Sequence, residues 1–132
     1  MRRLANHVAR WRRDNAGTTA IEMAFVLPVM ATLVIGVISL SMLGSAISAM
    51  HFAVEEASRC SAVNAVACGT HTATVNYARS KFHGAAVTPA FVSTAAGCGH
   101  TVTATATFEL NLAISTIHIP LSAVACYPGK DA

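Results

Sequence analysis

The sequence predicts an α+β protein. A long N-terminal helix, transmembrane in its first half, precedes a small disulfide-stapled extracytoplasmic domain with a β-hairpin. Three observations lead to this fold class. Residues 23–43 carry no charge, residues 101–114 alternate between polar and apolar side chains, and all four cysteines lie between residues 60 and 126. The length of 132 residues allows one small domain and excludes a multidomain enzyme.

The composition is too apolar for a conventional soluble globule. Hydrophobic residues make up 54% of the chain and charged residues 11%, against roughly 25% charged residues in an average soluble domain. Disordered chains show the opposite bias, with few apolar residues and much charge. The apolar residues must therefore be concentrated in one part of the chain.

The uncharged run is long enough to cross a membrane, since a spanning helix needs about 20 apolar residues. We place the span at about residues 20–43. Five arginines precede it: Arg2, Arg3, Arg10, Arg12 and Arg13. The positive-inside rule then puts the N-terminus in the cytoplasm and the C-terminal domain outside. A cleaved secretory signal stays open as an alternative, because small residues follow at 44–48, although its apolar stretch is normally only about 7–15 residues.

The junction between the basic segment and the apolar run has a specific spacing. The basic segment ends at Gly17, and Glu22 follows at the fifth position after that glycine. This arrangement resembles a type IV prepilin processing site, and more closely the TadE-like family of tight-adherence pilus proteins. The residues that carry the resemblance are Gly17, Ala20, Ile21, Glu22, Met23, Pro28 and Gly36. One departure is Thr18, where many type IV pilins have Phe or Met; small residues there are usual in the tight-adherence branch.

The resemblance implies a pseudopilin, of the minor kind, that a prepilin peptidase cleaves between Gly17 and Thr18. Glu22 and Pro28 are the expected assembly and recognition residues. The implied partners are the peptidase, other pilin or pseudopilin subunits, the inner-membrane assembly platform and the membrane itself. The implied location is the bacterial inner membrane, single-pass with a periplasmic C-terminal domain, and then an extracellular pilus.

These expectations divide the chain into a leader at 1–17, a long helix at 18–67 and an extracytoplasmic domain at 68–132. Glu22 is expected in the first turn of the helix, where the helix dipole favours a negative charge. Pro28 lacks an N–H and should kink or loosen the helix between about residues 24 and 28. At Gly69, glycine suits a helix C-cap.

A row of small residues follows the span at every fourth position. Its expected packing positions are Ser41, Ser45, Ala49, Ala53 and Ala57, and it continues through Ser61 and Ala65. Small residues at this spacing let another element approach the helix closely. The partner is either a neighbouring helix or this protein's own small domain.

The C-terminal half predicts a hairpin. Residues 101–114 alternate as a strand with one buried face, residues 117–125 continue as a second strand, and the turn falls near 112–117. Pro120 places the second strand at an edge or breaks it. Weaker patterns predict a short helix at 72–83 and a strand at 86–95.

Cysteine use points to an oxidising compartment. Cys60, Cys68, Cys98 and Cys126 all follow the span, and an even count there predicts two disulfides. Three pairings exist, and we favour Cys68–Cys98 with Cys60–Cys126. A metal site using the Cys and His residues at 68–71 and 98–100 is the alternative, disfavoured because its spacings are irregular for zinc. We expect no metal and no cofactor.

No catalytic motif occurs in the sequence. It has no GxSxG, HExxH or phosphate-binding glycine loop and no paired carboxylates in the predicted domain. We therefore expect a structural protein and not an enzyme, and, because the arginines lead straight into an apolar run, no nucleic-acid partner. Two other interpretations stay open: an uncleaved single-span anchor that presents a binding module, and a small secreted disulfide protein whose N-terminus is a signal.

Overall fold

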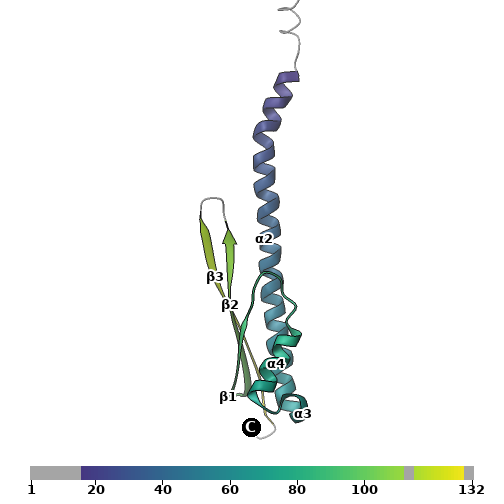
Figure 1. Cartoon of the computed structure of the whole chain (residues 1–132), viewed down its shortest axis with the longest axis vertical. Coiled ribbons are helices and arrows are strands. Elements are labelled where there is room, and N and C mark those ends of the chain that lie inside the picture. The colour runs from purple at the N-terminus through teal and green to yellow at the C-terminus, as the bar shows by residue number, and fades with distance from the viewer. Residues whose placement is uncertain (1–15, 112–114, 130–132) are drawn as a thin grey trace, which may run out of the picture. The chain divides into compact units, whose positions relative to one another are not determined.

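The computed structural model describes residues 16–111 and 115–129 (Figure 1). It divides into two compact units, the first ending at Ile38 and the second beginning at Ser39. Helix α2, Ala16–Val63, contributes residues to both units. Each unit is treated separately below. The sequence had placed the start of the domain at residue 68, but the half of α2 that follows Ile38 groups with the sheet because its side chains share the sheet's core.

The second unit combines helices with one antiparallel sheet. After α2 come α3, Ala65–Cys68, and α4, His71–Lys81. The strands are β1, Ala90–Ala96, β2, Gly99–Asn111, and β3, Thr116–Tyr127, in the sheet order β1-β2-β3. The α+β class, the hairpin and the extra helix and strand are thus confirmed.

The register of the sheet explains how β3 accommodates its proline. Thr107 of β2 lies opposite Pro120 of β3, and β3 is an edge strand, as the sequence predicted. An edge strand has a row of backbone groups that need no partner in the sheet, so the missing N–H of proline costs no ladder hydrogen bond there.

The long helix ends four residues earlier than predicted. The expected end was residue 67, but α2 stops at Val63 and Asn64 has a non-helical backbone with φ −129° and ψ 83°. The Asn64 side chain accepts a hydrogen bond from the Ala67 amide at 3.1 Å and so caps α3. Gly69 is the C-cap of that short helix, with right-handed backbone angles; a Cβ there would collide with the Ala65 carbonyl oxygen.

One hydrophobic core holds the second unit together. The inward face of the sheet, the buried side of α2 and Ala78 of α4 supply it. Its members are Ala46, Met50, Ala53, Val54, Ala57, Ala78, Phe91, Val102, Ala104, Phe108, Leu121 and Ala123. Along β2 the threonines at 101, 103, 105 and 107 alternate with these core residues, so the periodicity of the sequence predicted the buried face correctly.

Candidate membrane-anchoring and assembly helix

The part of the first unit that the structure describes is an apolar helix without buried side chains. Every described side chain from Thr19 to Ile38 is exposed or nearly so, and Phe25 keeps 75% of its surface accessible. The stretch of α2 from Thr19 to Val63 is long and apolar enough to cross a membrane, and its most apolar 18 residues are not buried. A core helix of a soluble protein would be mostly buried, so this exposure favours a helix whose apolar side chains face lipid.

The predicted processing site lies at the start of α2. Gly17 and Thr18 have helical backbones, because α2 begins at Ala16. Glu22 is exposed and lies in the second helical turn. This corrects the expectation that Glu22 occupies the first turn, because the helix begins before the predicted processing site, at Ala16. Residues 1–15 of the predicted leader at 1–17, with all five arginines, lie outside the described residues.

Pro28 lies inside α2, and the helix continues through it without a break. The proline has no N–H to offer the Ala24 carbonyl, so one hydrogen bond of the helical ladder is missing there. One turn later the Thr32 hydroxyl donates to the Val29 carbonyl at 2.8 Å. Such bonds back to the helix satisfy a hydroxyl in an apolar stretch and accompany bending of membrane helices.

The burial of the small residues increases along the row. Ser41 and Ser45 are exposed, Ala49 is half-buried, and Ala53 and Ala57 are fully buried in the core of the second unit. The partner of the buried positions is therefore the protein's own domain, the second of the two partners considered. A close approach is visible at Ala49, whose Cβ would lie 3.2 Å from a Cβ added to Gly84.

The four cysteines form two disulfides, as predicted, but the favoured pairing is wrong. The bonds are Cys60–Cys68 and Cys98–Cys126, with sequence separations of 8 and 28 residues. Cys60 meets Cys68 because the chain turns sharply at Asn64. Cys98 meets Cys126 because Thr101, three residues after Cys98, lies opposite Cys126 in the β2–β3 register. The Thr101 hydroxyl lies 3.5 Å from the Cys98 sulfur and 3.2 Å from the Cys126 sulfur.

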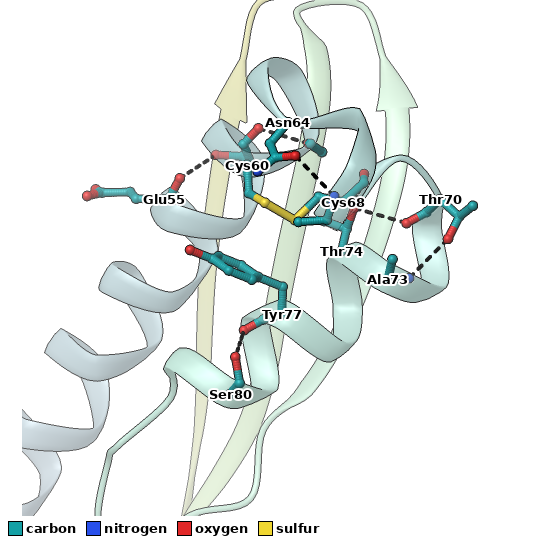
Figure 2. The surroundings of a disulfide bond; sticks show 12 residues. Glu55, Cys60, Asn64, Cys68, Thr70, Ala73, Thr74, Tyr77 and Ser80 are labelled. Atoms are coloured by element: carbon teal, nitrogen blue, oxygen red, sulfur yellow. Dashed lines mark hydrogen bonds between the residues drawn. A yellow bond between two sulfur atoms is a disulfide. The ribbon is translucent and has the colours of Figure 1, made fainter.

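Backbone and hydroxyl hydrogen bonds surround the first disulfide (Figure 2). The Cys68 amide donates to the Asn64 carbonyl at 2.9 Å. The buried Thr74 hydroxyl lies 3.1 Å from the carbonyl oxygens of both Cys68 and Thr70. The Thr70 side chain caps α4 by accepting from the Ala73 amide at 3.2 Å. The disulfide and these caps together fix α3 and α4 against the end of α2.

The family comparison bears directly on the apolar helix. Residues 17–59 match the model of the TadE-like protein family. The match begins at Gly17 and ends just before the first cysteine, so it covers the apolar helix and its buried continuation, about a third of the chain. Searches of curated proteins and of solved structures gave no match.

The match confirms the resemblance drawn from Gly17, Glu22 and their neighbours. TadE-like proteins are structural components of tight-adherence pili, so the match supports a pseudopilin-like role and interactions with other pilus components. The exposed apolar helix supports a single-pass membrane anchor. Both observations favour a structural role over catalysis.

Proposed function

We propose that this protein is a minor pseudopilin of a tight-adherence pilus, cleaved after Gly17 by a prepilin peptidase and assembled through its N-terminal helix. The observation that carries the proposal is the TadE-like match, which starts at Gly17 and continues into a helix with exposed apolar side chains. Before assembly the helix holds the protein in the inner membrane, with the second unit in the periplasm. The assembly platform and other pilin subunits then accept it.

The packing of α2 argues against a secretory signal that is removed near residue 48. Ala46 is fully buried in the core of the second unit, and α2 runs through this region without interruption. Cleavage there would take Ala46 out of the core and expose apolar side chains of the sheet. A cut after Gly17 leaves every member of the core in the mature chain.

Cleavage is tested by replacing Gly17 with valine. The bulky side chain should prevent entry into the peptidase, so Gly17→Val should retain the leader of 17 residues and migrate as a heavier species. Gly17→Ala is the matched control and should still be processed. N-terminal sequencing of the membrane-extracted wild type should begin at Thr18. An unchanged mass for Gly17→Val would refute cleavage at this site.

Assembly is tested at Glu22. After cleavage, the new amino group of Thr18 on a neighbouring subunit can pair with this carboxylate near the membrane edge. Opposite charges at about 4 Å interact by about 4 kcal/mol at an effective dielectric of 20, before desolvation is subtracted. Glu22→Gln keeps the shape and removes the charge, so it should leave cleavage and insertion intact but reduce incorporation.

The measurement is the amount of subunit that co-purifies with pili or with the assembly platform. Glu109→Gln is the matched control, because it removes an exposed carboxylate from the second unit. Normal incorporation of Glu22→Gln would leave that carboxylate as a group at headgroup level with no role in subunit pairing.

A further inference from the structure

The two disulfides of the second unit differ in their exposure to solvent. Cys60 and Cys68 keep 8% and 2% of their surface accessible, so the first bond is buried. Cys98 and Cys126 are both exposed. A thiolate must reach a disulfide sulfur directly in order to attack it. A thiol in solution can therefore attack Cys98–Cys126 in the folded protein, whereas Cys60–Cys68 is shielded.

The Cys98–Cys126 bond lies at one end of the sheet, outside the hydrophobic core. Cys98 belongs to the short turn between β1 and β2, and Cys126 is the penultimate residue of β3. Neither cysteine is among the buried residues or among the partly buried residues packed against the core. The pairing of β2 with β3 continues from this end as far as Asn111. Opening the disulfide therefore leaves the core and the backbone ladder in place.

The Thr101 hydroxyl contacts the two sulfurs of this bond unequally. It donates to the Cys126 sulfur at 3.2 Å, and the Cys98 sulfur lies farther from the same oxygen, at 3.5 Å. A hydroxyl has only one proton to donate, so the shorter contact with Cys126 takes it. A hydrogen bond to an ionised acceptor is roughly twice as strong as one to a neutral acceptor. The hydroxyl therefore stabilises Cys126 most when that sulfur becomes a thiolate, which makes Cys126 the better leaving group.

We propose that Cys98–Cys126 is a surface site for thiol–disulfide exchange with an extracytoplasmic dithiol protein, and that the Thr101 hydroxyl directs the attack to Cys98. The attacking thiolate bonds to the Cys98 sulfur while the Cys98–Cys126 bond breaks, and the electron pair of that bond leaves on Cys126. The second thiolate of the dithiol protein then attacks its own sulfur in the mixed disulfide and releases Cys98. Two electrons pass from the dithiol to the disulfide, and the two protons that the dithiol loses are taken up by Cys98 and Cys126.

The same steps in reverse form the bond in a unit that is already folded. A protein disulfide first links to Cys98, and the Cys126 thiolate then attacks the Cys98 sulfur and closes the bond. The β2–β3 register brings the two cysteines together, so this bond can open and close while the sheet stays paired and Cys60–Cys68 stays closed. All of these contacts lie within the second unit, so the exchange does not depend on cleavage at Gly17 or on pilus assembly.

Stepwise reduction of the native protein tests which bond reacts. The oxidised full chain in detergent is treated with increasing dithiothreitol, quenched with N-ethylmaleimide and mapped by peptide mass spectrometry, which can follow all four cysteines. Cys98 and Cys126 should be labelled together at concentrations that leave Cys60 and Cys68 unlabelled. Labelling of all four cysteines in parallel would mean that reduction requires unfolding of the second unit and would overturn the proposal, as would earlier labelling of Cys60 and Cys68.

A short exposure to a monothiol identifies the sulfur that is attacked. Glutathione is added for seconds and N-ethylmaleimide then traps the thiolate that has left. Glutathione should be found on Cys98 and the maleimide on Cys126. The opposite distribution, or an equal one, would refute attack directed to Cys98.

The role of the hydroxyl is tested by Thr101→Val, which keeps the shape of the side chain and removes the donor. Reduction of Cys98–Cys126 by dithiothreitol should become about fivefold slower, and glutathione should attach to both cysteines. A loosened sheet would speed the reduction, so a slower rate separates the two effects. Thr105→Val is the matched control, four residues along β2, and should react as wild type does. Unchanged rate and attachment in Thr101→Val would overturn the directing role of the hydroxyl.

Discussion

Helix α2 passes through two kinds of surroundings, and the two parts differ in what they bury. From Thr19 to Ile38 its apolar side chains are exposed around the whole helix. From Ser39 to Val63 one side is buried, with Ala46, Met50 and Ala53 at 1% exposure or less, while Glu55 and Arg59 stay exposed. A helix that is apolar all round requires an apolar solvent, whereas a one-sided helix packs on a domain in water.

The two parts of α2 differ more in the size of their side chains than in their hydrophobicity. The first part has large side chains such as Phe25, Leu33 and Ile35, which suit contact with acyl chains. The buried side of the second part is dominated by alanine, which lets the sheet and α4 come close to the helix axis. The same chain thus provides a lipid-facing segment and a protein-facing segment without a break in the helix.

The largest expected effect comes from the disulfides, which lie only in the second unit. In the chain-entropy treatment, the Cys98–Cys126 bond contributes about 3.5 kcal/mol and the shorter Cys60–Cys68 loop about 2.5 kcal/mol. The paired variants Cys98→Ser/Cys126→Ser and Cys60→Ser/Cys68→Ser should lower the free energy of unfolding of the second unit in that order. Hydrogen exchange of the β2 amides measures the loss.

Neither pair of substitutions should release the protein from the membrane. The anchor lies in the first unit, which has no cysteine. Alkaline carbonate extraction checks this point, with wild type as the reference. Release of either variant, each of which lacks one disulfide, would show that the helix depends on the folded domain for anchoring and would contradict the distinction between the two parts of α2.

The sequence predicted the elements because their signals are local. The alternation at 101–114 and the uncharged run each identify an element from neighbouring residues alone. The disulfide pairing was not predictable in this way, since it depends on which residue of β2 faces Cys126 and on the turn at Asn64. The signal that was available for Cys60–Cys68 is their short separation next to an asparagine that can cap a new helix.

The candidate site shows the same limit. Gly17 and Glu22 were identified from spacing, and the family match confirms the resemblance that they carry. The row of small residues was recognised as a packing surface, but its partner was left open between a neighbouring helix and the protein's own domain. Only the tertiary fold decides this, because a small residue on a helix indicates close approach without indicating what approaches.

The smaller expected effect tests that packing directly, with one substitution in each part of α2. Ala53 has no exposed surface in the core, whereas Ala31 is exposed in the first unit. Ala53→Leu inserts three carbon atoms where no space is available, so it should lower the free energy of unfolding of the second unit by about 1–3 kcal/mol. Ala31→Leu adds the same atoms to a lipid-facing surface and should change it by less than about 0.5 kcal/mol.

Hydrogen exchange of the β2 amides again provides the measurement, now for Ala53→Leu, Ala31→Leu and wild type in the same detergent. Faster exchange in Ala53→Leu alone would place the tightly packed interface in the second unit. If the β2 amides exchange at the same rate in both variants as in wild type, the sheet does not pack against α2 at Ala53. The row of small residues would then be available to a neighbouring subunit. In that case Ala53→Leu should reduce the amount of subunit that co-purifies with pili, in the assay used for Glu22→Gln.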